Sequence, residues 1–107
     1  MKVNILGTDY EILYQNKEEN TKLEEANGLC ETYSKKIIVE KVSEHPMHLE
    51  KMEEFQKKVL RHEIVHAFLH ESGLDSSSDW ARNEEIVDWI ALQAGKLMQT
   101  FERTECV

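Results

Sequence analysis

The chain has 107 residues, of which 40% are hydrophobic and 32% charged, and its formal net charge is −8. This length and composition predict one domain, residues 1–107, with a modest core. The acidic charge argues against nucleic-acid or membrane partners, since both need a basic protein surface. The first residues lack the apolar segment of a signal peptide. Cys30 and Cys106 are too far apart for a C-x-x-C metal motif. We therefore expect a cytoplasmic protein with two reduced thiols.

The first forty residues are patterned as β-strands. Apolar and polar residues alternate over residues 2–15, with a turn at Gly7–Asp9, which predicts a β-hairpin. The charged segment 16–27 predicts a connection with one or two helical turns. Two further strands are expected at residues 29–33 and 36–40, the second with an apolar centre. We expect about four antiparallel strands in all.

A long helix is predicted over residues 47–71. Pro46 marks its start, because proline is tolerated in a first helical turn, and Gly73 marks its end. His45 and His48 are expected to face solvent near this start. A stripe at helical spacing defines the buried face. Its members are Met52, Phe55, Val59, His62, His66 and Leu69.

A second helix is predicted from about Arg82, or one turn earlier, to about Arg103, after a polar loop at residues 75–79. Strands followed by helices predict an α+β fold.

The first helix contains His62-Glu63-Ile64-Val65-His66, which has the form H-E-x-x-H. Because a helix turns once per 3.6 residues, both imidazoles lie on one face and can bind one metal ion. Glu63 lies beside them as a general base for a zinc-activated water. The motif therefore predicts a zinc hydrolase, and foremost a peptidase.

A catalytic zinc needs a third protein ligand and an open position for water. The second helix opens with the run Asn83 to Asp88, which places Glu84 and Asp88 one turn apart on the same face. We predict Glu84 as the third ligand and Asp88 as the acceptor for the N–H group of a ligating imidazole. Glu85 faces about 100° away, toward Trp89, and is the alternative ligand.

Such a site also needs a hydrogen-bond donor for the oxyanion and a surface that binds the substrate. Hydrolysis of an amide is helped by a donor to the developing oxyanion, and His70, Tyr33 and Arg82 are candidates. His70 is equally suited to a structural role near the helix C-terminus. A peptide or protein substrate is expected to add as a strand to an exposed sheet edge. We take the strand Ile37–Glu40, directly before the first helix, as that edge.

The two motifs resemble those of zincin metallopeptidases. The run Arg61 to His70 resembles their active-site helix, and its H-E-x-x-H-x-x-x-H form is similar to the ImmA/IrrE peptidases of bacteria and phages. The run Asn83 to Asp88 resembles the N-E-x-x-x-D run of gluzincins, which implies that Glu84 ligates zinc and Asp88 supports a ligand histidine. The resemblance implies a minimal zincin-like fold, one Zn²⁺ per chain and a phage or prophage relationship.

Two other interpretations use the same residues. A zincin-fold protein that binds or regulates without cleaving would keep the metal, although Glu63 counts against it, since a structural site needs no base. A hydrolase of non-peptide amides is the other alternative. The sequence does not identify the substrate.

Overall fold

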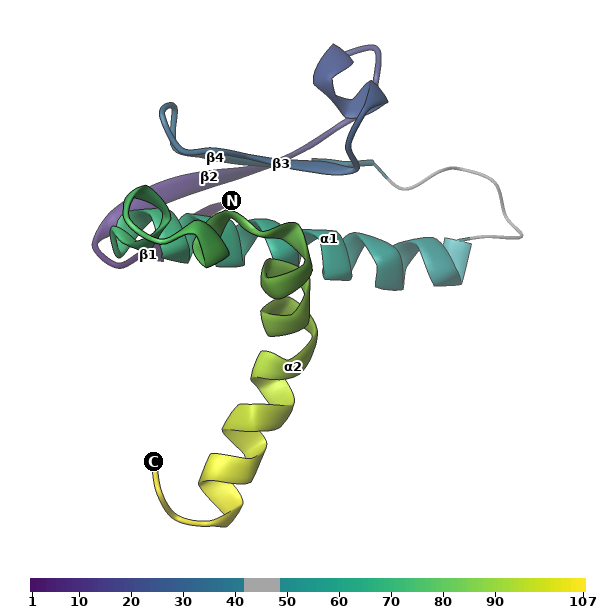
Figure 1. The fold of residues 1–107 in the computed structure, drawn as a ribbon. Helices are drawn as coiled ribbons and strands as arrows, with labels where there is room; N and C mark the ends of the chain where they lie inside the picture. The colour runs from purple at the N-terminus through teal and green to yellow at the C-terminus, as the bar shows by residue number, and fades with distance from the viewer. Residues whose placement is uncertain (42–48) are drawn as a thin grey trace.

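The computed structural model of the chain describes residues 1–41 and 49–107 and has four strands followed by two α-helices (Figure 1). The elements are β1 (Lys2–Ile5), β2 (Thr8–Gln15), β3 (Gly28–Glu31), β4 (Lys36–Glu40), α1 (Leu49–Glu71) and α2 (Glu84–Arg103). A short 3₁₀ helix, Thr21–Glu24, lies in the connection between β2 and β3. This arrangement confirms the predicted α+β class.

The strands form one mixed sheet in the order β1-β2-β4-β3. The pairs β1–β2 and β3–β4 are antiparallel, but β2 and β4 are parallel, with Ile12 opposite Ile37. The prediction of a wholly antiparallel sheet is therefore wrong. After β2 the chain crosses to the far edge of the sheet, where β3 runs antiparallel to β2. The chain then turns back, and β4 fills the position between β3 and β2. This route makes β4 run in the same direction as β2.

The free edges of the sheet are β1 and β3, so the prediction that Ile37–Glu40 is an edge strand is also wrong. The reason is visible in its sequence: Ile37, Ile38 and Val39 are exposed by only 0%, 2% and 1%. A strand that is apolar on consecutive residues is covered on both faces and typically lies inside a sheet. The edge beside the helices is β3.

The β1–β2 turn lies one residue earlier than predicted, at Leu6 and Gly7, and Thr8 already belongs to β2. Both turn residues have positive φ, 50° at Leu6 and 94° at Gly7, as a two-residue hairpin with right-handed strand twist requires. The side chain of Asn4 accepts a hydrogen bond from the Gly7 N–H group at 3.0 Å.

Helix α1 lies between the sheet and the first half of α2 (Figure 1). On the sheet side, Ala67 joins a core that contains six buried residues. These are Ile5, Tyr10, Ile12, Ile37, Val39 and Ala67. On the other side, Leu69 packs with Val87 of α2 and with Ala81. The middle of α1 is thus held on two sides, whereas its predicted start, with Pro46, His45 and His48, lies outside the described residues. Gly73, with φ of 85°, follows its end as predicted.

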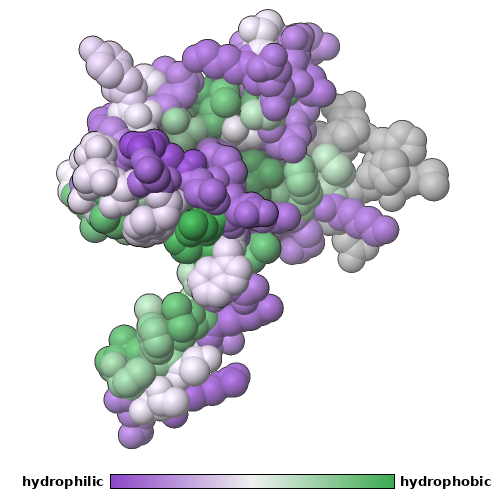
Figure 2. Space-filling model, in the orientation of Figure 1, coloured by the Kyte–Doolittle hydropathy of each residue, from purple (hydrophilic) through white to green (hydrophobic). Residues whose placement is uncertain are grey.

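Helix α2 begins at Glu84, two residues later than predicted, because Asp79–Arg82 form a 3₁₀ helix and Asn83 caps the α-helix. Its second half projects away from the sheet and α1 (Figure 1), and apolar side chains gather along it (Figure 2). Among them Leu97 and Met98 are each 47% exposed. Neither α-helix has an apolar segment long enough to cross a membrane, within the residues that the structure describes.

Candidate metal centre and active site

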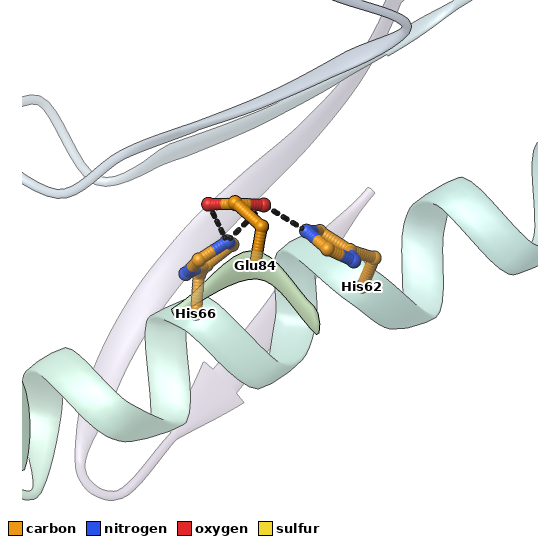
Figure 3. A group of neighbouring side chains, drawn as sticks. All are labelled: His62, His66 and Glu84. Carbon is orange, nitrogen blue, oxygen red and sulfur yellow. Dashed lines mark hydrogen bonds and ion pairs between the residues drawn. The ribbon is translucent and has the colours of Figure 1, made fainter. Parts of the chain in front are cut away.

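The side chains of His62, His66 and Glu84 converge on one point between α1 and α2 (Figure 3). One candidate ligand atom from each residue lies within 4.8 Å of the other two. His62 Nε2 is 2.7 Å from Glu84 Oε2, and His66 Nε2 is 3.0 Å from Glu84 Oε1. The three side chains predicted from the two motifs are therefore brought together, although they come from two helices.

This donor set fits a zinc ion. Zinc prefers imidazole nitrogen and carboxylate oxygen at about 2.0–2.2 Å, which puts neighbouring tetrahedral ligands about 3.4 Å apart. The observed separations between His and Glu atoms are slightly shorter, 2.7 and 3.0 Å, so a small movement of the Glu84 carboxylate admits an ion. Glu84 has the freedom for this, because 71% of its side chain is exposed, against 16% for His62 and 21% for His66.

Asp88 lies behind His62. Its Oδ1 atom is 3.3 Å from His62 Nδ1, so an N–H group on Nδ1 can donate to the carboxylate and leave the Nε2 lone pair free for a metal. Glu85, the alternative ligand, lies on another face of α2 and lines a hollow with Trp89 and Leu92. The structure thus places Glu84 at the histidines and Glu85 away from them.

The position of Glu84 follows from the start of α2. The Asn83 side chain accepts a hydrogen bond from the Ile86 N–H group at 3.0 Å, which is typical of a helix N-cap. One turn along, Val87 is fully buried against α1 and fixes the rotation of the helix. Partial burial opposes ionisation of Glu84, but hydrogen bonds and charge from His62 and His66 outweigh it, and the pKa of Glu84 is lowered.

Glu63 lies next to the three converging side chains and is only 8% exposed. Burial raises its pKa to about 7, with a further contribution from the negative charge of Glu84, while His62 acts in the opposite direction. A carboxylate whose pKa lies near neutral pH can both accept and donate a proton under physiological conditions, which is what a general base in hydrolysis must do.

A groove passes over Glu63 and Glu84. It consists of two hollows of about 260 and 440 Å³, both of which include Ala26, Gly28, Glu63 and Glu84 in their walls. The first extends past Phe55, Lys58 and Val59, and the second past Cys30, Thr32 and Asp75. Ala26 and the start of β3 at Gly28 therefore line both hollows, the rest of β3 as far as Cys30 lines the second, and Glu63 opens into both.

Comparison with known proteins identifies the family. Residues 20–106 match the family model named BSP, described as peptidases of plants and bacteria. The chain belongs to this family. The matched residues include β3, β4 and both helices, and hence every side chain of the candidate site. No curated protein and no solved structure matches the chain. The predicted likeness to peptidases is confirmed at this level, but the narrower likeness to ImmA/IrrE enzymes receives no support from it.

The three oxyanion candidates do not line the groove of this BSP-family chain in the described structure. Tyr33 is 100% exposed in the β3–β4 turn. His70 Nδ1 is 2.9 Å from Asp75 Oδ2, and Arg82 donates to the Asp75 backbone carbonyl oxygen and, at 2.6 Å, to Asp79. Sequence reasoning missed Asp75, which binds His70 and lines the groove. Its position after a helix end gave no signal, because its partners come from different elements.

Proposed function

We propose that this protein is a zinc-dependent metallopeptidase of minimal zincin, gluzincin-like type. The observation that carries the proposal is the convergence of ligand atoms from His62, His66 and Glu84 within 4.8 Å, next to a buried Glu63. Membership in a peptidase family supports cleavage of peptide bonds as the reaction. The donor set of two imidazoles and one carboxylate supports zinc, since this set leaves a coordination position open for chemistry.

The roles of the residues follow from their places. His62, His66 and Glu84 would hold the ion, and Asp88 would keep the His62 ring in the tautomer that presents Nε2. When bound, zinc supplies Lewis acidity, which lowers the pKa of water and polarises a carbonyl group. Glu63 accepts the proton of the attacking water and delivers it to the departing amine nitrogen. Because burial raises the pKa of Glu63 to about 7, this carboxyl group can bind and release the proton near neutral pH.

A peptide substrate would lie along β3. The Asn27 carbonyl oxygen accepts a hydrogen bond from the Glu40 N–H group at 2.9 Å, so this pair is hydrogen-bonded across the antiparallel ladder. Hydrogen-bonded and non-hydrogen-bonded pairs alternate, and Gly28 and Cys30 therefore direct their backbone groups away from β4. These free groups border the groove beside Glu63. An extended peptide can pair with them as an additional strand.

The principal alternative is a zincin-fold binding or regulatory protein that keeps the metal and cleaves nothing. A hydrolase of non-peptide amides is the third interpretation. The burial of Glu63 beside the metal residues favours an enzyme, because a purely structural metal site gains nothing from an acidic side chain with an elevated pKa.

The variant Glu63→Gln separates these alternatives. For a peptidase we expect turnover of peptide and unfolded-protein substrates to fall by about 10²–10⁴-fold, while zinc content stays unchanged. Glu85→Gln is the matched control, since it removes a carboxylate from α2 outside the site, and its turnover should equal that of the wild type. Wild-type protein that binds zinc but cleaves no peptide would contradict the proposal. Cleavage of small amides alone would support the third interpretation.

A further inference from the structure

We propose that Gly28 is a positioning residue of the active site: its missing side chain lets the free edge of β3 lie directly against Glu63. The inference rests on the proposed peptidase function and deepens it, because it assigns the feature of the chain that fixes the distance between the base and a bound peptide.

The evidence is the space around Gly28. A Cβ atom at this position would lie 2.4 Å from Val59 Cγ1 and 3.1 Å from both Cγ and Oε2 of Glu63. The same atom on Gly95 in α2 would meet nothing within 4 Å. The backbone of β3 therefore packs against the turn of α1 that carries Glu63. Val59 lies one turn before His62, so this contact joins the strand to the metal-binding part of the helix.

Backbone conformation does not explain the glycine. The two glycines with positive φ in the described structure are Gly7 and Gly73, and Gly28 lies in a regular ladder opposite Val39. Alanine could adopt this backbone conformation but could not fit. Space for the strand, and not freedom of φ, is what the position requires.

The Glu63 contacts at 3.1 Å need a movement of only a few tenths of an ångström, but the 2.4 Å contact with Val59 is much harder to relieve. Val59 is β-branched, and such side chains strongly prefer one χ1 rotamer in a helix. Val39, opposite Gly28 in the ladder, is 1% exposed and fixed in the core. The four-residue strand β3 is paired on one side only, so it is the element that would move. Restoring an ordinary carbon–carbon contact of about 3.5–4.0 Å requires a shift of at least about 1 Å.

Such a shift would act on the substrate and leave the metal ligands in place. The backbone groups of Gly28 face the free edge, where a peptide would pair, and the ligands lie on α1 and α2. A displacement of about 1 Å between a bound reactant and its catalytic group can lower a rate by about 10²-fold. Gly28→Ala should therefore impair recognition of an extended peptide much more than binding of a small zinc ligand.

The test uses the zinc-loaded protein and two inhibitors that share a zinc-binding group, acetohydroxamate and an acetyl-dipeptide hydroxamate. For Gly28→Ala we expect the dissociation constant of the peptide hydroxamate to rise at least tenfold. The constant for acetohydroxamate and the zinc content should change by less than twofold. Gly95→Ala is the matched control, because it adds the same methyl group in open space, and both of its constants should equal those of the wild type.

A second variant tests whether the clash with Val59 causes the loss of peptide affinity, and it also serves if Gly28→Ala alone fails to fold. Val59→Ala removes the atom that lies 2.4 Å from the added methyl group. We expect the double variant Gly28→Ala/Val59→Ala to bind the peptide hydroxamate within threefold of Val59→Ala alone. Equal peptide affinity in Gly28→Ala and wild type, or no recovery in the double variant, would overturn the inference and leave the zinc site standing. If neither hydroxamate binds the zinc-treated wild type, the proposed function fails, and the inference with it.

Discussion

Two carboxylates on helix α1, Glu63 and Glu71, lie two turns apart and have opposite surroundings. The Glu71 side chain is 12% exposed and accepts three hydrogen bonds. The donors are Thr8 Oγ1 at 2.9 Å, Tyr10 Oη at 2.7 Å and Lys35 Nζ at 2.8 Å. Glu63 is 8% exposed, and no hydrogen bond from the described part of the chain reaches its carboxylate.

These surroundings indicate a structural role for Glu71 and agree with the catalytic role that we propose for Glu63. Lys35, then Tyr10 and Thr8, lower the pKa of Glu71 to about 2, so it stays ionised and ties β2 and the β3–β4 turn to the end of α1. Burial raises the pKa of Glu63 to about 7. Among the described residues, every fully enclosed side-chain nitrogen or oxygen atom has a hydrogen-bond partner. The Glu63 carboxylate is not fully enclosed, because it opens into the groove. This free acceptor capacity at a buried carboxylate is what the proposed role of Glu63 as general base requires.

The largest effect is expected beside the candidate metal centre, for Asp88→Asn on α2. The variant weakens the negative acceptor behind His62 Nδ1, so the His62 ring loses part of its fixed orientation. We expect the dissociation constant for zinc to rise by about 10–100-fold. Competition with a chromophoric chelator measures it. An unchanged constant would show that Asp88 does not support the ligand histidine.

At the C-terminal end of α1, Glu71 already accepts three hydrogen bonds and should govern the stability of the fold in acid. Its pKa in the folded protein, about 2, lies below the ordinary value of 4.5, so the ionised carboxylate stabilises the fold above about pH 4.5. This contribution is lost as the pH falls from about 4.5 through about 2. Glu71→Gln should therefore melt well below the wild type at pH 7, with the gap in Tm closing toward pH 2. The exposed Glu102→Gln is the control and should show no gap, and a pH-independent gap for Glu71→Gln would contradict the assignment.

A smaller effect is expected for Tyr10→Phe, which removes one of the three donors to Glu71. Tyr10 is fully buried, and a hydrogen bond to a charged acceptor stabilises a fold by about 1.5–3 kcal/mol. Urea unfolding should report a loss of this order. Tyr14→Phe, at a residue 42% exposed, is the matched control and should stay within about 0.5 kcal/mol of the wild type. A similar loss of unfolding free energy in both variants would contradict a specific contribution from the hydrogen bond between Tyr10 and Glu71.

The sequence predicted the parts of this molecule that depend on local periodicity. The helical spacing of His62 and His66, the position of Glu84 one turn before Asp88, and the strand at residues 36–40 all follow from the geometry of a single element. The convergence of Glu84 with the histidines was predicted as well, because each motif points its functional side chains to one face of its own helix.

The sequence did not predict relations between distant elements. The parallel pairing of β2 with β4 depends on the route of the chain across the sheet, and local pattern carries no information on it. The assignment of β4 as an edge failed for the same reason. His70 was considered for stabilising the oxyanion, but it pairs with Asp75, which lies in the short 3₁₀ helix Leu74–Ser76 that follows α1. The contact of Gly28 with Val59 is likewise a distance between a strand and a helix, which composition does not encode.

The most direct test of the account is the zinc content of the purified protein, free of any tag, measured by elemental mass spectrometry. Glu84→Ala and Glu85→Ala, two neighbouring substitutions on α2, are measured beside the wild type. We expect about one zinc per chain in the wild type and in Glu85→Ala, and loss of zinc in Glu84→Ala. Absence of zinc from the wild type after loading, or its full retention in Glu84→Ala, would contradict the three-ligand site.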